Sequence, residues 1–260
     1  MIDARAQSSQ ASSQASNQAI SAERAVRAHA SAHASAHTAA HGFSLIEVAI
    51  ALAIIGVVTA MALPNVSRYL ENANGRAAAK SIADAFNFAR AQAIRTGNNH
   101  LVFFAAGGAG DTAGNALTSA DGRAMPILVL NDGRPGSVDQ NCVINAGEET
   151  IVFDAQVGVG WGNNSAPSTE EAPDETAVTS IPASGSSFFA PNGTTPVTWV
   201  QFRPDGVPVA VDNACTAGRL GTGGGTIYLW TQNRDYAVTL APLGGVRVHV
   251  WNSSTGAWTS

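Results

Sequence analysis

The chain has few of the residues on which enzymes most often depend. Beyond position 42, its only histidines are His100 and His249, and its only cysteines are Cys142 and Cys215. It has no HExxH zinc motif, no Ser-His-Asp arrangement with supporting context, and no phosphate-binding glycine motif joined to a strand and a helix. The glycine-rich run 221–225 has no lysine and is expected to form a flexible turn. We therefore predict no enzymatic activity, no cofactor and no metal site.

Charge is nearly absent from one long apolar segment. Residues 43–63 carry a single ionisable side chain, Glu47. A helix needs ~20 apolar residues to cross the ~30 Å hydrocarbon core of a bilayer, so the segment is predicted to be a transmembrane helix. A charge at the centre of a bilayer costs at least ~2.5–3.5 kcal/mol, so Glu47 indicates a function with a partner. If the chain is cut between Gly42 and Phe43, the new α-amine is a candidate for that partner, in this chain or in a neighbouring subunit.

The run Gly42-Phe43-Ser44-Leu45-Ile46-Glu47, followed by this apolar helix, resembles the type III signal of type IV pilins and pseudopilins. The resemblance implies that a prepilin peptidase cleaves after Gly42 and methylates Phe43. It assigns Glu47 to membrane extraction and subunit registration, and it implies other pilins and an inner-membrane assembly platform as partners. The alternative is an ordinary signal anchor with one stray acid.

The same resemblance implies a bacterial inner-membrane protein that crosses the membrane once and later enters a pilus or pseudopilus. Its N-terminus is expected in the cytoplasm and its head in the periplasm. Gly56 and Pro64 interrupt the apolar helix, and loosening is expected between them because proline removes a backbone donor and clashes with the preceding turn. In filaments of the family this stretch melts. The alternative is a harmless kink in lipid.

Residues 1–42 are rich in Ala, Ser and Gln, and we expect them to be an unfolded leader that is removed. Histidines recur in it every four residues, which on a helix is metal-ligand spacing, but a discarded repeat is the favoured interpretation. The leader is long for the family, and Val26 is a possible alternative start. The four histidines are His29, His33, His37 and His41.

Residues 64–97 are predicted to continue the helix as an amphipathic segment that packs on a sheet and ends at Gly97. Gly75 is a further point of expected loosening. This segment carries 5 basic against 2 acidic residues, whereas residues 98–260 carry 6 Lys/Arg against 14 Asp/Glu, a net charge of −8. The apolar positions expected to face the sheet are Ile82, Phe86, Ala89 and Ala93.

Residues 98–260 are predicted to form one β-rich globular head with an antiparallel sheet, because apolar alternation recurs between Gly- and Asn-rich turns. In 246–251, for example, three valines fall on one face. The expected fold is therefore α+β, a type IV pilin fold in which a long N-terminal helix packs on an antiparallel sheet. The predicted strands are 100–104, 127–131, 150–154, 197–202, 226–231, 236–240 and 246–251.

Three segments resemble the H-type (FimT-like) minor pseudopilins: 89–95, the turn 202–206, and the strand around 245–248. The resemblance implies a minor subunit of a type II secretion pseudopilus or a type IV pilus, at the tip and priming assembly. The alternative is a minor pilin that binds DNA for uptake. Phosphate contacts require clustered positive charge, and the acidic head argues against them. The arginines that would make such contacts are Arg219, Arg234 and Arg247.

Residues 155–196 are predicted to be a long exposed loop, disordered except where Phe188 and Phe189 pin it to the head. One alternative is that the loop contacts a partner subunit or a secreted substrate. The other is that its acids bind Ca²⁺. These acids are Glu170, Glu171, Asp174 and Glu175.

Cys142 and Cys215 are predicted to form a disulfide, because both lie in the part expected outside the cytoplasm, where disulfides persist. Two free thiols are the alternative.

Overall fold

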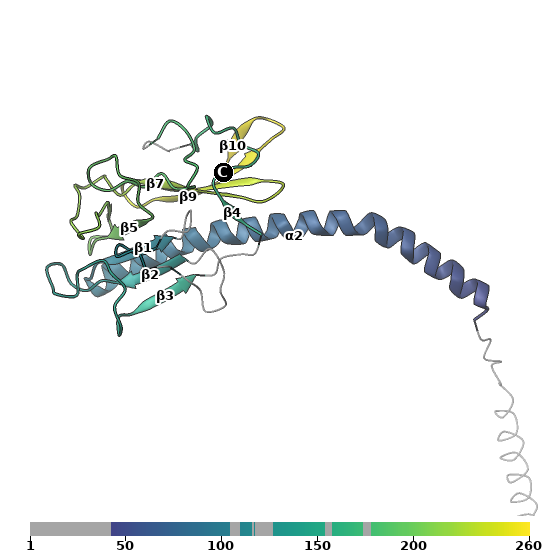
Figure 1. Cartoon of the computed structure of the whole chain (residues 1–260), viewed down its shortest axis with the longest axis horizontal. Helices are drawn as coiled ribbons and strands as arrows, with labels where there is room; N and C mark the ends of the chain where they lie inside the picture. Colours follow the sequence, from purple (N-terminus) through teal and green to yellow (C-terminus); the bar gives the residue numbers. More distant parts are fainter. Residues whose placement is uncertain (1–42, 105–109, 116, 118–126, 154–157, 174–177) are drawn as a thin grey trace, which may run out of the picture. The chain divides into compact units, whose positions relative to one another are not determined.

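The computed structural model describes residues 43–104, 110–115, 117, 127–153, 158–173 and 178–260. The chain divides into two compact units, one ending at Val58 and the other comprising Thr59–Ser260. In its described part, the first unit is the beginning of helix α2 (Leu45–Thr96). The second unit contains the rest of α2 and two β-sheets (Figure 1).

Helix α2 begins at Leu45, two residues after the predicted start, and ends at Thr96 as predicted. It ends at Thr96 because Gly97 adopts a φ of 71°, which favours glycine, and donates its N–H to the carbonyl of Ala93 at 3.0 Å. The helix is continuous through Gly56, Pro64 and Gly75. Melting between Gly56 and Pro64 in a filament stays a prediction.

The second half of α2 is amphipathic, as predicted. Its buried positions recur with helical spacing, and five of them are alanines, which let the sheets approach closely. Phe86 lies at the centre of this face, with its ring 6.0 Å from that of Phe188 and 6.3 Å from that of Phe202. The most deeply buried residues are Ala79, Ile82, Ala85, Phe86, Ala89 and Ala93.

The first sheet has the order β3-β2-β1-β5-β6, and every pairing in it is antiparallel. Central strand β1 has all five residues buried, whereas edge strand β3 is mostly exposed. The strands are β1 (His100–Phe104), β2 (Ile127–Asn131), β3 (Thr150–Phe153), β5 (Trp199–Phe202) and β6 (Pro208–Val209).

The second sheet has the order β10-β9-β8-β7-β4 and is also antiparallel. The head therefore has two sheets where the sequence predicted one. Strands β4, β6 and β10 were missed, because two or three residues are too few to show a period. The strands are β4 (Gly160–Trp161), β7 (Gly225–Trp230), β8 (Asp235–Leu240), β9 (Val246–Asn252) and β10 (Ala257–Thr259).

Strand β9 is covered on both faces. Its three valines pack against the main core as partly buried residues, while His249 and Trp251 are buried on the opposite face. Trp251 belongs to a second cluster with Ala166, Ala172 and Ile181. The simple half-buried pattern predicted for this strand is therefore wrong.

The prediction of an exposed loop at 155–196 is wrong for the described part of that region, because residues of the second cluster lie in it. In its described part, 158–173 and 178–196, this region contributes a strand and several buried side chains. Asp235 ties it to β8, because its carboxylate accepts the backbone N–H groups of Asn164, Ser165 and Ala166. Phe188 is buried in the main core, as predicted.

Gly75 serves close packing and does not loosen the helix. A Cβ there would lie 2.8 Å from Thr231 Cγ2 and 2.9 Å from Tyr236 Cζ. The Tyr236 hydroxyl donates to the carbonyl of Asn72 at 3.1 Å, which fixes its ring against α2.

Gly75→Ala is therefore expected to destabilise the head by about 1–3 kcal/mol, the usual cost of overpacking. The measurement is thermal unfolding of the full chain in detergent, followed by tryptophan fluorescence. Gly56→Ala is the matched control, because a Cβ at Gly56 meets nothing within 4 Å. Equal midpoints for the two variants would contradict the packing role of Gly75.

Candidate functional site

The N-terminal end of α2 has the local structure of a capped helix. Ser44 Oγ accepts the N–H of Ile46 at 3.2 Å, and the Ser44 carbonyl accepts the N–H of Val48 at 3.1 Å. Glu47 follows three residues after Ser44, the spacing of a capping box, and an acid in the first turn is favoured by the helix dipole. The capped first turn is therefore a favourable position for Glu47. Whether Glu47 has a further function depends on what surrounds the helix.

No part of the chain described by the structure covers the apolar surface around Glu47. Phe43 is 80% exposed and Leu45 is 88% exposed, and the large apolar residues of α2 remain exposed as far as Leu70. Among the described residues, α2 is the one helix long and apolar enough to cross a membrane. An uncovered apolar surface of this extent marks a membrane or protein interaction site. Lipid or neighbouring apolar helices are the two kinds of cover that fit it.

Residues 38–63 match the family model described as the prokaryotic N-terminal methylation motif. The N-terminus is of the pilin and pseudopilin type. The match covers 26 of the 260 residues and includes Gly42, Phe43 and Glu47. Searches of curated proteins and of solved structures found no match. Gly42 and the histidines at positions 29, 33, 37 and 41 lie outside the described residues.

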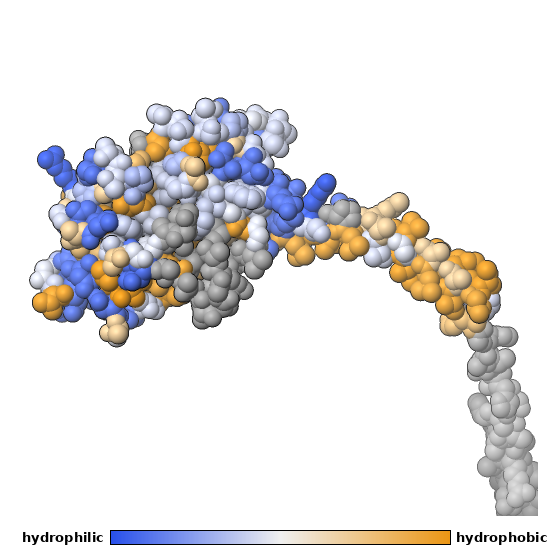
Figure 2. Space-filling model, in the orientation of Figure 1, coloured by the Kyte–Doolittle hydropathy of each residue, from blue (hydrophilic) through white to orange (hydrophobic). Residues whose placement is uncertain are grey.

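The predicted fold class is confirmed. A long, initially apolar helix continues into a segment that packs on antiparallel sheets, which is an α+β, pilin-like fold. The space-filling view shows the apolar residues of the beginning of α2 in orange (Figure 2).

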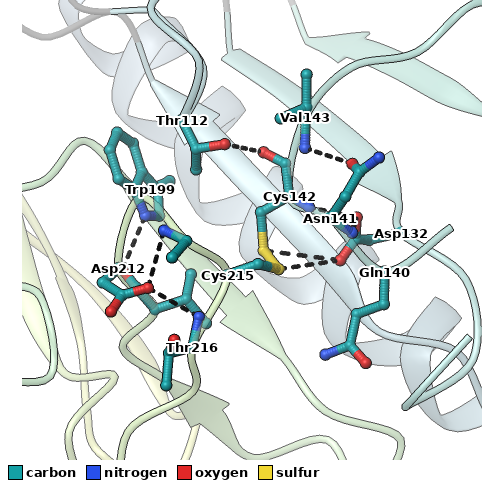
Figure 3. Close-up of a disulfide and its surroundings, with 12 residues drawn as sticks. Thr112, Asp132, Gln140, Asn141, Cys142, Val143, Trp199, Asp212, Cys215 and Thr216 are labelled. Carbon is teal, nitrogen blue, oxygen red and sulfur yellow. Dashed lines mark hydrogen bonds between the residues drawn. A yellow bond between two sulfur atoms is a disulfide. The ribbon is translucent and has the colours of Figure 1, made fainter. Parts of the chain in front are cut away.

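The predicted disulfide is present. Cys142, between β2 and β3, is bonded to Cys215, between β6 and β7, with 5.4 Å between their Cα atoms (Figure 3). Both cysteines have positive φ, 58° and 60°. The bridge thus joins the β2–β3 connection to the β6–β7 connection.

A buried carboxylate lies beside the disulfide and was not predicted (Figure 3). Asp132 is 0% exposed, and its Oδ1 accepts the N–H groups of Cys142 at 2.8 Å and Asn141 at 3.2 Å. Its Oδ2 lies 3.7 Å from each sulfur. Burial raises the pKa of Asp132 to about 6, and the hydrogen bonds from Cys142 and Asn141 oppose that rise.

Asp132 and the two cysteines bring potential ligand atoms together within 4.8 Å, the one such group among the residues that the structure describes. Because both sulfurs are bonded to each other, neither is a thiolate, and the group is not a metal site in this state. The calcium alternative at 170–175 is untested, since Asp174 and Glu175 lie outside the described residues.

Asp132 predicts a pH dependence of stability. Its pKa rises from 3.8 in the unfolded chain to about 6 in the fold, so the native state binds the proton more tightly. Stability should therefore fall as the pH rises from about 4 to about 6, by up to about 3 kcal/mol, and this contribution should stay constant above that range. Asp132→Asn is expected to lack this component. Urea unfolding of the full chain in detergent, from pH 4 to 8, measures it, and parallel curves for the two proteins would contradict it.

Two of the three arginines considered for DNA contact lie in different connections of the head, and the third lies on a strand. Arg219 is in the turn between β6 and β7, Arg234 is in the β7–β8 turn, and Arg247 is on β9 opposite Thr239. Arg234 is five residues from Thr239 along β8, which is about 17 Å of strand. Arg234 and Arg247 therefore do not form one compact basic patch.

Proposed function

We propose that the chain is a minor pseudopilin or minor pilin, a non-catalytic subunit of a type II secretion pseudopilus or a type IV pilus that sits at the tip and primes assembly. The observation that carries this proposal is the methylation motif at 38–63 on an uncovered apolar helix that leads into a pilin-like head. The motif supports anchoring in the inner membrane before assembly.

The mechanism is mechanical. A prepilin peptidase cuts after Gly42 and methylates Phe43, and the assembly platform draws the subunit from the bilayer into a bundle of helices. An acid buried in such a bundle is tolerated only with a compensating charge, which the α-amine of Phe43 or of a neighbouring subunit supplies to Glu47. The disulfide supports a head in the oxidising periplasm.

Support for the H-type assignment comes from packing. Its three segments converge, because Arg90 Nη1 donates to the carbonyl of Gly244 at 3.0 Å and a Cβ on Gly206 would meet Ile94 Cγ1 at 3.0 Å. The turn at 202–206 closes as expected, with Gly206 N–H donating to the carbonyl of Arg203 at 2.8 Å. DNA uptake is the weaker proposal, given the acidic head and the separated arginines.

Intact-mass measurement and N-terminal sequencing test the proposal on protein from membranes of cells with and without the prepilin peptidase. The expected result is N-methyl-Phe43 that depends on the peptidase. An uncut chain that retains His29 to His41 would reduce the protein to a membrane-anchored domain. The minor role further predicts only a few copies per sheared filament, and a copy number near that of the main subunit would overturn it.

A further inference from the structure

A polar hollow of about 260 Å³ lies within the second unit, where α2, the β7–β8 turn and the β9–β10 turn meet. Its lining is rich in hydrogen-bond donors. Val250 and Trp251 form its apolar part. The polar lining residues are Arg76, Asn233, Arg234, Asn252, Ser253 and Thr259.

Both arginines line the hollow, and both lie near the Tyr236 side chain. Arg76 is hydrogen bonded to the Tyr236 hydroxyl, and the positive charges of Arg234 and Arg76 both act to lower the pKa of Tyr236, against the larger effect of burial, which raises it. Among the residues that the structure describes, neither arginine makes an ion pair with a carboxylate. Glu71, on a nearby turn of α2, instead accepts a hydrogen bond from Asn233 Nδ2.

The turns hold these donors in place. Arg234 N–H donates to Thr231 Oγ1 at 3.2 Å, which fixes the β7–β8 turn. Asn252 Oδ1 accepts the N–H and the hydroxyl of Ser254 at 3.0 and 2.7 Å. The oxygen of the Asn252 amide is thus engaged within its own turn.

The size of the hollow limits the ligand. Pockets for drug-sized molecules and cofactors occupy ~300–1,000 Å³. At about 260 Å³ the hollow is smaller than these and has room for an acidic side chain, and its two arginines carry the guanidinium group that binds carboxylates and phosphates.

We propose that this hollow binds a carboxylate side chain of a neighbouring pilin-type subunit and so sets the register between adjacent heads. This inference rests on the proposed function, because it requires a filament in which heads meet.

A carboxylate fits the observations better than a phosphate. Arg76 lies 13 residues beyond Leu63, about 20 Å of helix, whereas each headgroup layer of a bilayer is only ~5–8 Å thick. A nucleic acid needs a track of positive charge, and this hollow offers two arginines in a head of net charge −8. Heads with such an acid excess expose suitable groups, as Asp139 and Glu149 are exposed in this one.

The test places a photo-crosslinking amino acid, p-benzoylphenylalanine, at Thr255 of the full chain in its native cells, because Thr255 is exposed in the β9–β10 turn and does not line the hollow. After illumination, mass spectrometry identifies the attached peptide. We expect an Asp- or Glu-containing peptide of a pilin-type subunit, and at least about tenfold less of it in the double variant Arg76→Gln/Arg234→Gln. Arg76→Lys/Arg234→Lys should keep part of the yield, since it keeps the charge but loses the bidentate geometry.

Arg219→Gln is the matched control, because it removes an exposed arginine that does not line the hollow. Crosslink yields are compared at equal protein abundance. The thermal midpoint of each variant is measured as well, and only variants with the wild-type midpoint are compared, so that unfolding is excluded. An adduct with lipid or nucleic acid, an adduct insensitive to the arginine variants, or no adduct would each overturn the inference. N-methyl-Phe43 is measured in the same samples: its presence keeps the proposed function when the inference fails, and its absence rejects the proposed function itself.

Discussion

Glu47→Ala is expected to leave cleavage after Gly42 intact and to reduce incorporation into filaments by more than about 100-fold. Without Glu47, the α-amine is left as an unpaired charge, and such a charge in a membrane costs at least ~2.5–3.5 kcal/mol. Each 1.36 kcal/mol corresponds to a factor of ten, so the loss should be about 100-fold or more. Cleavage should not change, because the cut lies before Phe43. Immunoblots of membranes and of sheared filaments measure the two steps separately.

Glu47→Gln is the control that separates charge from capping. Ser44 already caps the helix, and glutamine can replace glutamate in the capping box while removing the charge. A charge-based role predicts that Gln fails like Ala, whereas a capping role predicts that Gln assembles normally. Normal incorporation of both variants would reject the role of Glu47 between subunits. A subunit at the very tip has no preceding neighbour, so at the proposed tip position the loss is expected only if Glu47 pairs with the α-amine of its own Phe43. Copies per filament are therefore counted in the same samples.

The sequence was sufficient for elements whose signals are local. The end of α2 was predictable because Gly97 follows the last apolar position, and β1, β2 and β8 were predictable from runs of apolar and β-branched residues. The methylation motif was predictable for the same reason, since its residues are contiguous. The disulfide followed from having only two cysteines in the part of the chain expected outside the cytoplasm.

What the sequence did not reveal depends on contacts between distant segments. Residues 155–196 look like a loop because of their composition, yet Asp235 binds three backbone N–H groups in their described part, about 70 residues away in the chain. Asp132 looks like a turn residue after β2, and only the fold brings it beside the disulfide. Arg76 and Arg234 likewise line one hollow only because β8 packs on α2 through Tyr236 and Gly75.

Removing the disulfide is expected to be the largest single loss of stability in the head. Cys142 and Cys215 are 73 residues apart, and the loop-entropy model gives about 4 kcal/mol for a closed loop of that length. For a domain of this size, such a loss lowers the thermal midpoint by on the order of 10 °C. The measurement compares the full chain in detergent with and without reductant, and then the double variant Cys142→Ala/Cys215→Ala, by tryptophan fluorescence.

Asp132 makes the disulfide prediction more specific. Cys142 adopts a positive φ, and the N–H groups of Cys142 and Asn141 donate to the Asp132 carboxylate. If the bridge maintains these hydrogen bonds, the cost of Cys142→Ala/Cys215→Ala should differ between the wild-type and Asp132→Asn backgrounds by more than about 0.5 kcal/mol, the limit for independent sites. Equal costs would show that the two features act independently. A midpoint unchanged by reductant, with both cysteines alkylated beforehand, would show instead that the native chain carries free thiols.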